Sequence, residues 1–397
     1  MSEIPEYVRP ASSVINEQVC LDPSLDTQTV MLVVTEACNL QCVYCYEKTK
    51  TTRTMPESLI RDIIVRHMSQ ERFSNISFDF FGGEPLLQFD TIQSVVNWFH
   101  TRTWKKGHRF TLSTNGTLLD DDNKRWLESV RDCVIPMVSL DGTKTAHDAN
   151  RSNSYDRVVC HAPFLRDHWP EQPVRITVGP NTLDQLAAGI KHIHSMGLAV
   201  EAGVVFEDIW GSPDEKATHL ETYERQLAEL VVFYGENPNL PVPMILSRKI
   251  DSLLMKHEPG RPYCGAGEFM VCYTPDGATY PCHRFTPFCS TRPSPRPLAD
   301  IAALDGEPCQ NCLLIPICPT CQGFNWEVHS NTLRRTTFHC EFFKRDIVAS
   351  AKLLIRRIED RLDGPDLSDR EAEEMAQQVV CIQKLLDSSP HLRAPTG

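Results

Sequence analysis

Short apolar runs alternate with longer mixed segments over the first half of the chain. The runs are VMLVV (30–34), ISFDFF (76–81), RFTLST (109–114), VIPMVSL (134–140), VRITV (174–178) and AVEAGVVF (199–206). Segments of helical length lie between them at 56–69, 90–102, 120–130 and 183–196. Strands separated by helices of this size indicate βαβ units and a parallel sheet, so six units predict an α/β fold shaped as a partial, TIM-like (β/α)6 barrel.

The texture of the chain changes beyond residue 238. From 238 to 308 it is rich in Pro, Gly and Cys, so we expect the sheet domain to end near Leu240. A helix is then predicted by apolar residues at every third or fourth position, namely Phe343, Ile347, Ala351, Leu354, Ile358 and Leu362. Gly364-Pro365 should stop it, and 368–386 has the pattern of a last helix. The predicted parts are an N-terminal segment (1–28), an α/β domain (29–240), a Cys-rich domain (241–345) and C-terminal helices with a tail (346–397).

Charge and targeting signals narrow the function classes. The 40 Lys+Arg and 52 Asp+Glu give a net charge of −12, which argues against a general grip on nucleic acid or anionic lipid. The N-terminus lacks the apolar stretch of a signal peptide, and no window is long and apolar enough for a membrane span. We therefore expect a soluble, cytoplasmic protein. Its 16 cysteines are then expected to serve metal binding or catalysis rather than disulfides.

Three cysteines follow the first predicted strand with C-x3-C-x2-C spacing, at Cys38, Cys42 and Cys45. Three thiolates on one loop can hold a cubane iron-sulfur cluster and leave its fourth iron open to a substrate or cofactor. A zinc site with a distant fourth ligand, or a chance cluster of buried cysteines, is the alternative. The position favours the cluster, because α/β folds place active sites at the carboxyl ends of strands.

This segment closely resembles the radical SAM superfamily, over about residues 28–235. The resemblance implies a 4Fe-4S cluster on the three cysteines, with S-adenosylmethionine (SAM) on the open iron and Tyr44 near the adenine. It also implies that Gly82-Gly83-Glu84-Pro85 takes the SAM amino group, and that Arg151 or Arg157 takes the carboxylate. Further SAM-site candidates at the strand ends are Ser113, Asn115 and, for the ribose, Ser139. Each of these residues could instead be a turn, cap or surface position.

A second cysteine system runs from Cys264 to Cys340. Its eight thiols would suit two fully ligated 4Fe-4S clusters, whereas the two C-x2-C pairs alone would equally suit a zinc ribbon. The pattern resembles the SPASM extension of radical SAM enzymes that modify peptides. That resemblance implies one auxiliary cluster on Cys264, Cys272, Cys282 and Cys321, and a second on Cys309, Cys312, Cys318 and Cys340. The remaining cysteines, which we expect to be mostly buried, are Cys20, Cys133, Cys160, Cys289 and Cys381.

Two details qualify the first auxiliary set. The spacing from Cys318 to Cys321 is x2 where the family commonly has x3, so Cys289 could replace Cys321. Sulfatase-maturing relatives carry an acidic residue directly after the cysteine that matches Cys282, whereas this chain has His283. His283 is our candidate catalytic base, or else a hydrogen-bond donor to a cluster sulfur. Glu207 and Asp208 are the next candidates for the base.

The resemblance implies an enzyme that takes hydrogen from a ribosomally made precursor peptide and installs a cross-link. Formylglycine formation, other peptide oxidation and epimerisation are alternative reactions, and a zinc-stabilised interaction module is the non-enzymatic one. Expected partners are the peptide and a flavodoxin- or ferredoxin-type electron donor. Residues 1–28 are too few for a leader-binding domain, so we expect the leader to be recognised by other surfaces of the chain or by a separate protein. Apolar residues at Ile4, Tyr7, Val8, Val14 and Ile15 suit either a small hairpin or a disordered tail.

Overall fold

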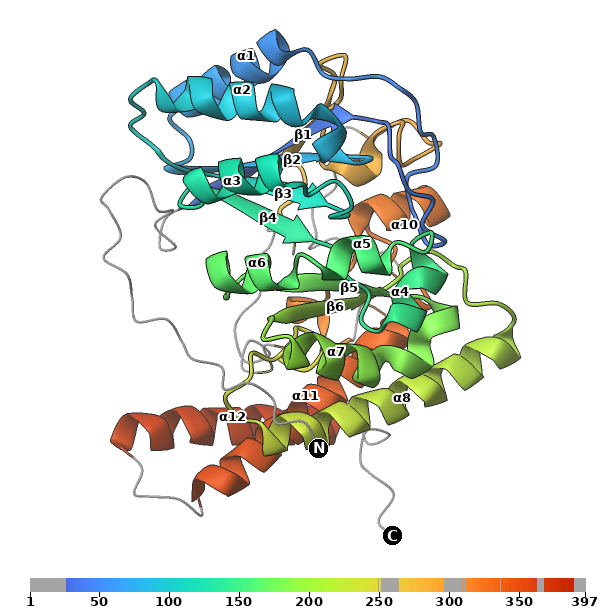
Figure 1. Ribbon diagram of the computed structural model, residues 1–397. Coiled ribbons are helices and arrows are strands. Elements are labelled where there is room, and N and C mark those ends of the chain that lie inside the picture. Colours follow the sequence, from blue (N-terminus) through green and yellow to red (C-terminus); the bar gives the residue numbers. More distant parts are fainter. Residues whose placement is uncertain are drawn as a thin grey trace.

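The fold contains all six strands expected from the sequence (Figure 1). The computed structural model describes residues 26–248, 250, 264–295, 309, 312–335, 337–362 and 368–388. The strands are β1 (Thr27–Thr35), β2 (Asn75–Gly82), β3 (Gly107–Thr114), β4 (Val134–Val138), β5 (Val174–Val178) and β6 (Val200–Val204). The N-terminal hairpin or tail, Cys20 and the Gly364-Pro365 stop lie outside the described residues.

The strands form a parallel, open barrel wall. β1 to β4 pair in sequence order, β5 pairs with β6, and an isolated parallel bridge from Ser139 to Arg175 joins the two groups. A strand from the Cys-rich region, β7 (Met270–Tyr273), adds parallel to the free edge of β1, and β8 (Thr279–Tyr280) turns back antiparallel to it. The sheet therefore continues past the expected end of the α/β domain near Leu240, so the Cys-rich region is built directly onto the barrel.

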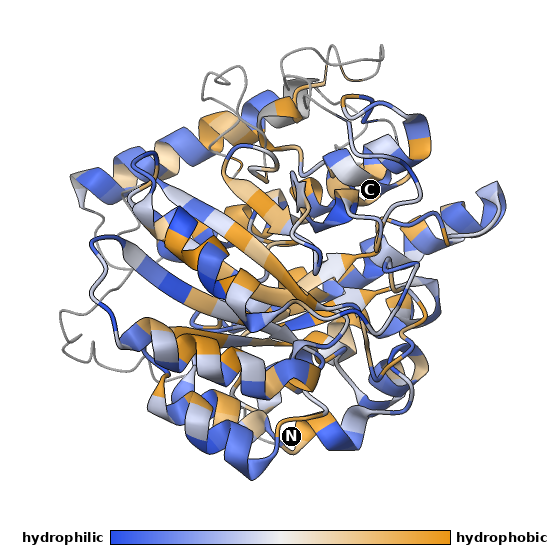
Figure 2. Cartoon of the chain, turned by 90° about the horizontal axis from the view of Figure 1, so that it is seen from above, coloured by the Kyte–Doolittle hydropathy of each residue, from blue (hydrophilic) through white to orange (hydrophobic). Residues whose placement is uncertain are grey.

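The two faces of the sheet have different chemistry because side chains alternate along a strand. Phe78 and Phe80 of β2 point to the outer face, where both stack with Phe110 at centroid distances of 5.4 and 5.5 Å. Asp79 and Phe81 point inward, and Thr111 of β3 donates a hydrogen bond of 3.0 Å to Asp79. Figure 2 shows apolar residues gathered on the strands and on the helix faces that meet them. The outer face thus carries the main core, and the inner face is left for a partly polar cavity.

The helices on the outer face agree with the expected segments. They are α1 (Glu57–Ser69), α2 (Phe89–His100), α3 (Asp121–Ser129) and α7 (Leu186–Ser195). Three further helices between β4 and β5 were not expected, namely α4 (Lys144–Asn150), α5 (Tyr155–Val159) and α6 (Ala162–His168). They have only five to seven residues, too few for a helical period to emerge from the sequence. Single-turn 3₁₀ helices are η1 (Pro85–Gln88), η4 (His283–Phe285) and η5 (Ile315–Ile317), and η2 (Pro180–Gln185) has six residues.

Long helices from distant parts of the sequence lie side by side below the barrel (Figure 1). α8 (Pro213–Glu236) begins at a capping box of Ser212 and Glu215, and it packs along α11 (His339–Leu362). α10 (Gln322–His329) and α12 (Asp369–Ser388) complete the described helices. The two helices expected after Cys340 are thus confirmed. None of the helices in the described ranges is long and apolar enough to cross a lipid bilayer.

A buried carboxylate joins α8, α11 and the segment that leads into the Cys-rich region. Asp346 of α11 accepts a hydrogen bond of 2.5 Å from the Tyr223 hydroxyl of α8 and pairs at 2.7 Å with the Arg248 guanidinium. Burial raises the pKa of Asp346 to about 6, although Arg248 acts against that rise. The carboxylate therefore depends on these two partners to be tolerated in the interior.

We predict that Asp346→Ala lowers the free energy of unfolding by about 3 kcal/mol, because it leaves the buried Arg248 charge without a partner. Chemical denaturation monitored by circular dichroism measures this. The control is Glu374→Ala, which removes an exposed ion pair with Arg370 on α12 and should change stability by less than about 0.5 kcal/mol. Equal stabilities of the two variants would contradict the assigned role of Asp346.

Candidate active site

The three-cysteine loop is held against the end of β2 by backbone contacts that only glycine allows. Gly82 has a φ of +135°, and a Cβ on Gly83 would lie 2.1 Å from the Ala37 carbonyl oxygen. The Gly83 amide donates to the Thr35 carbonyl at 3.0 Å, and the Glu84 amide donates to the Ala37 carbonyl at 2.8 Å. The glycine pair therefore fixes where Cys38 begins the loop.

A second clamp holds the same loop from its far side. Glu36 is buried, and its carboxylate accepts hydrogen bonds from the Arg53 guanidinium at 2.5 and 2.9 Å and from the Thr51 hydroxyl at 2.5 Å. The loop from Cys38 to Lys50 is thus closed at its base by a bidentate ion pair. This geometry keeps the three thiols on one side of the loop, facing the barrel interior.

All three thiols line one cavity of about 540 Å³ at the carboxyl ends of the strands. Most residues that we assigned to the SAM site line the same cavity, namely Tyr44, Gly82, Gly83, Ser113, Asn115, Ser139 and Arg151. They come from loops far apart in the sequence, as expected for the active-site end of a parallel barrel. The structure therefore brings the three cysteines and these seven residues together.

A buried Asp141 organises the wall beside Cys42. Its carboxylate accepts a hydrogen bond of 2.5 Å from the Tyr44 hydroxyl and forms an ion pair of 3.0 Å with Arg151. Arg151 in turn lies 4.0 Å from the Cys42 sulfur. Burial raises the pKa of the Cys42 thiol, and the Arg151 charge opposes that rise. Of the two arginines considered for the SAM carboxylate, Arg157 is exposed outside the cavity lining, so the geometry favours Arg151.

Glu84 lies behind the cavity wall and not in it. Its side chain is fully buried, and its two oxygens accept hydrogen bonds from the Leu86 amide (3.0 Å), the Thr114 hydroxyl (2.7 Å) and the Asn115 amide (2.7 Å). The expectation that this carboxylate takes the SAM amino group does not fit these contacts. Glu84 instead ties the end of β3 to the glycine turn. Pro85 is also buried and opens the η1 helix.

The opposite wall of the cavity comes from the Cys-rich region. His283 packs against Phe81 and Tyr46, with ring centroids 4.8 and 5.3 Å away. Burial lowers the pKa of His283 to about 3, so its neutral ring is a weak proton acceptor near pH 7. These contacts favour a role for His283 in forming the cavity wall. They favour it less as the catalytic base that we expected.

The two fallback candidates for the base are separated by the structure. Glu207 lines the cavity, but it pairs at 2.6 Å with Arg284. Asp208 is exposed, pairs with Lys216 at 2.6 Å and does not line the cavity. Of the two, only Glu207 is therefore placed to meet a substrate.

The first auxiliary set gathers around the β7–β8 hairpin. Burial raises the pKa of the Cys282 thiol well above its ordinary range, and the nearby Cys321 and Cys264 thiols add to that rise. The pKa of the Cys272 thiol is likewise raised by burial and by the neighbouring thiols of Cys282 and Cys289. Cys321 lines the main cavity, whereas the buried Cys289 lies toward Glu47 and Cys45. The hairpin thus brings five thiols into one neighbourhood.

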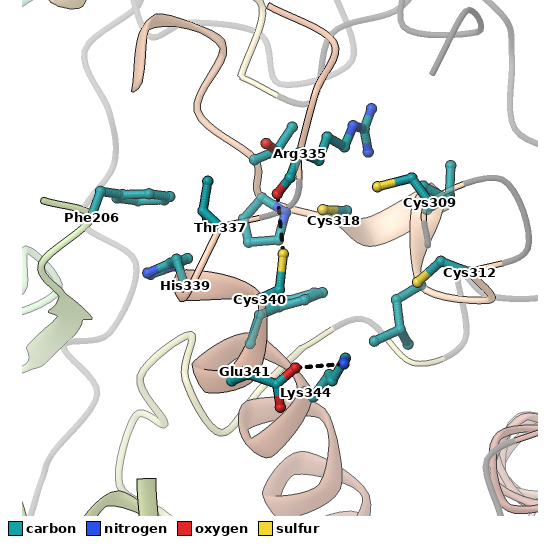
Figure 3. Close-up of a pocket in the computed structure, with 15 residues that line it drawn as sticks. Phe206, Cys309, Cys312, Cys318, Arg335, Thr337, His339, Cys340, Glu341 and Lys344 are labelled. Atoms are coloured by element: carbon teal, nitrogen blue, oxygen red, sulfur yellow. Dashed lines mark hydrogen bonds and ion pairs between the residues drawn. The ribbon is translucent and has the colours of Figure 1, made fainter. Parts of the chain in front are cut away.

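The second auxiliary set surrounds a separate cavity of about 350 Å³. Figure 3 shows the thiols of Cys309, Cys312, Cys318 and Cys340 around a common space. The Cys340 thiol donates to the Arg335 carbonyl at 3.2 Å. Within the described ranges, no three Cys, His, Asp or Glu side chains are arranged to hold a metal ion.

Comparison with known protein families assigns residues 32–193 to the radical SAM superfamily. This match covers the cysteine loop, the glycine turn and the ends of β3, β4 and β5, but not the end of β6 that also lines the cavity. Residues 32–193 of this chain thus match the radical SAM superfamily. The match implies a 4Fe-4S cluster and SAM, for which the Cys38, Cys42 and Cys45 thiols and the cavity beside them are the candidate site.

Relatives of this radical SAM chain include proteins of several kinds. An uncharacterized protein of Methanocaldococcus jannaschii is 30% identical over 114 residues, which cover 28% of this chain and 38% of that protein. The radical SAM cyclopropyl synthase TigE of Paramaledivibacter caminithermalis is 21% identical over 368 residues, 84% of this chain and 74% of TigE. The first of these matches therefore spans less than half of the relative.

Solved structures share the fold across both the barrel and the Cys-rich region. The structure of anSMEcpe with bound AdoMet has a TM-score of 0.66 at 16% identity and covers 85% of this chain and 100% of that one. Streptococcus suis SuiB with the precursor peptide SuiA has a TM-score of 0.53 at 14% identity and covers 79% of this chain and 75% of that one. The likeness confirms the fold class of a radical SAM partial barrel with a Cys-rich extension and C-terminal helices.

Several residues that line the cavity were missed in the sequence. Lys50 and Glu47 line the cavity beside the thiols, and Phe206 lines both cavities while it stacks on His339 at a centroid distance of 3.8 Å. Arg175 lines the main cavity from β5. Only Arg175 carried a signal, because it interrupts the apolar pattern of its strand. Among the other cysteines, Cys381 and Cys289 are buried as expected, but Cys160 is exposed.

We predict that Gly83→Ala destabilises the protein by at least about 2 kcal/mol, because the new Cβ would overlap the Ala37 carbonyl oxygen. The iron content after anaerobic reconstitution should also fall. Melting temperature and iron analysis measure the two effects. Gly203→Ala is the matched control, since a Cβ there has no atom within 4 Å and should be tolerated. A Gly83→Ala protein with normal stability and iron content would refute the clamp.

Proposed function

We propose that this radical SAM enzyme is a peptide maturase that takes a hydrogen atom from a ribosomally made precursor peptide and installs an oxidative cross-link, either a carbon-carbon bond or a thioether. One observation carries the proposal. A single cavity is bounded on one side by the Cys38, Cys42 and Cys45 thiols and on the other by Cys321, His283 and Arg284 of the Cys-rich region. A substrate in this cavity would lie between the two cysteine systems.

Proteins of the same fold support a peptide as the substrate class. Structures of anSMEcpe hold AdoMet together with a Kp18Cys or a Cp18Cys peptide, and SuiB is bound to the precursor peptide SuiA. The cavity of about 540 Å³ is also open enough to admit a side chain on a peptide backbone beside SAM. These are the grounds for extending a peptide substrate to this chain.

The bound cluster and SAM would supply a primary carbon radical able to take hydrogen from an unactivated carbon. The residues of this chain bind and orient. Arg151, which lies 4.0 Å from the Cys42 sulfur, and Lys50 in the cavity lining would hold a carboxylate there. Tyr44 is held by Asp141 at the same wall. Phe206, Phe81 and His283 would exclude water from the substrate side. Glu207 is the cavity carboxylate on that side, and release from Arg284 would let it accept a proton.

A cross-link removes two hydrogens from the peptide. One leaves as a hydrogen atom and one as a proton, so one further electron must pass to an acceptor. We assign this role to auxiliary 4Fe-4S clusters on the two cysteine sets, with Cys264, Cys272, Cys282 and Cys321 in the first and Cys309, Cys312, Cys318 and Cys340 in the second. Proposed partners are a flavodoxin- or ferredoxin-type donor and, for the leader, the chain itself or a separate protein. The proposed location is the cytoplasm.

Formylglycine formation is the second candidate function, since the Cys-rich region also resembles that of the sulfatase-maturing enzymes. His283 stands where sulfatase-maturing relatives have an acidic base, and its pKa of about 3 makes it a poor substitute. The mass of the product separates the candidates. A cross-link lowers the peptide mass by two hydrogens, epimerisation leaves it unchanged, and formylglycine formation from cysteine has its own mass shift.

We predict that a triple variant with Ala at Cys38, Cys42 and Cys45 loses about four iron atoms per chain. It should also lose all dithionite-driven formation of 5′-deoxyadenosine, because no open iron remains to bind SAM. Iron analysis and chromatography of the SAM products measure this. Cys160→Ala, an exposed cysteine outside both cavities, is the control and should keep wild-type values. SAM cleavage by the triple variant would overturn the assignment of the SAM-cleaving site.

We predict that Cys318→Ala retains some SAM cleavage but forms no modified peptide, because the electron acceptor or substrate support is lost. The substrate is sought among short open reading frames next to this gene, and the products are measured by mass spectrometry beside the iron content and melting temperature. These last two measurements are needed because a bound cluster also contributes folding free energy. A folded Cys318→Ala protein that lacks about four iron atoms and still modifies the peptide at the normal rate would exclude a redox role for this cavity.

A further inference from the structure

Arg175 projects into the main cavity from the inner face of the barrel. Val174, Ile176 and Val178 of β5 are buried in the core on the outer face, so the residues between them face inward. Arg175 lies level with Ser139 at the end of β4, where its carbonyl accepts a hydrogen bond of 3.0 Å from the Leu140 amide. Its side chain is exposed and lines the cavity.

The guanidinium of Arg175 lacks a carboxylate partner among the residues that the structure describes. Its polar side-chain contact is a 3.5 Å approach to the Met137 sulfur. The other two cavity arginines each have one carboxylate partner in the protein, Asp141 at 3.0 Å for Arg151 and Glu207 at 2.6 Å for Arg284. A guanidinium is a rigid fork matched to carboxylates, and one left unpaired in a concave wall favours an anionic ligand.

Arg175 is not at the cysteine end of the cavity. The cations that lower the pKa values of the three thiols are Lys50 and Arg151. Arg175 instead opposes the burial-raised pKa values of Asp79 and of Glu201, the residue opposite it on β6. Both of those carboxylates have other partners, since Thr111 and Ser113 donate to Asp79 and the Met244 amide donates to Glu201. A carboxylate held beside the thiols is thus met by Lys50 and Arg151, and Arg175 is left for a second one.

Open space adjoins this guanidinium on the neighbouring strand. Thr177 of β5 pairs with Gly203 of β6, and both line the cavity on the same face as Arg175. A Cβ at Gly203 would have no atom within 4 Å. The glycine therefore leaves room for a ligand side chain next to Arg175, and no backbone conformation or close packing of the protein requires glycine there.

We propose that Arg175, Thr177 and Gly203 form a subsite that binds an acidic side chain, Asp or Glu, of the substrate peptide. Arg175 pairs with the carboxylate, and the space over Gly203 accommodates the side chain that carries it. This inference rests on the proposed function, because it takes the substrate to be a peptide. It adds that an acidic residue lies next to the position that is modified.

The test uses the anaerobically reconstituted full chain with SAM bound. The probes are a dansyl-labelled six-residue peptide amide with one aspartate, its asparagine counterpart, and the asparagine peptide with a free C-terminal carboxylate. Fluorescence anisotropy gives their affinities. The wild type should prefer the aspartate peptide amide about ten-fold over the asparagine amide, a difference typical of a close charge pair. A free C-terminus that binds as well as the aspartate would overturn the choice of a side-chain carboxylate.

Arg175→Gln should abolish this preference and leave the affinity for SAM, measured by equilibrium dialysis, unchanged. The matched control is Arg109→Gln on the inner face of β3. Arg109 also lowers the pKa of Asp79, but it does not line the cavity. It should keep the full preference. An unchanged preference in Arg175→Gln, or a loss of SAM binding in that variant, would overturn the proposal.

Gly203→Val tests the space without removing a charge. It should weaken both peptide amides at least five-fold with SAM binding retained, whereas a selective loss of SAM would assign the space to SAM and overturn the subsite. N-acetylaspartate methylamide separates the subsite from the proposed function. If the wild type binds no peptide but is thermally stabilised by this compound, and Arg175→Gln is not, the peptide function fails and the carboxylate subsite stands. The absence of both thermal stabilisation and a peptide preference would refute the carboxylate subsite and the peptide function together.

Discussion

The close approach of Gly83 to the Ala37 carbonyl is the contact on which the rest of the active site depends. It joins the end of β2 to the start of the cysteine loop by backbone hydrogen bonds, so the loop inherits the rigidity of the sheet. Glu84 then extends this contact to β3 through Thr114 and Asn115. A side chain on the glycine would separate the strands where three thiols must face one cavity. The sequence motif is thus a packing requirement before it is a ligand site.

The barrel interior contains charged side chains that a hydrophobic core would not tolerate. They differ in how deeply they are buried and in whether they have an oppositely charged partner. Asp141 and Arg151 form a fully buried pair beside Cys42, while Arg284 and Glu207 form a half-buried pair at the opposite wall. Between them, Arg175 is exposed to the cavity and lacks a carboxylate partner within the described part of the chain. Burying an unpaired charge costs far more than leaving it in contact with water. Paired groups therefore build the walls, and the unpaired guanidinium remains at the surface where a ligand can replace the water.

Elements with a clear apolar periodicity could be predicted from the sequence. Elements that are very short, or that depend on contacts with distant segments, could not. The six strands and the helices α1, α2, α3, α7, α11 and α12 follow from apolar spacing, whereas the long helix α8 was not predicted. The three-cysteine spacing located one wall of the cavity. The helices α4 to α6 were missed because they are too short to show a period. The placement of β7 beside β1 was missed because it joins strands more than 200 residues apart, which no local pattern encodes. For Glu84, the motif gives the neighbours in sequence but not the direction of the carboxylate, which contacts Leu86, Thr114 and Asn115.

The same limitation explains why the substrate end of the cavity is harder to predict than the SAM end. The SAM end is built from short motifs at strand termini, whose spacing survives in the sequence. The substrate end is built across distant segments. Phe206 follows β6 and stacks on His339 at the start of α11, so that one aromatic wall separates the main cavity from that of Cys309, Cys312, Cys318 and Cys340. Because a single side chain lines both cavities, the two cysteine systems are neighbours across one ring. The rings of Phe206 and His339 therefore lie between a substrate in the main cavity and the second set of thiols.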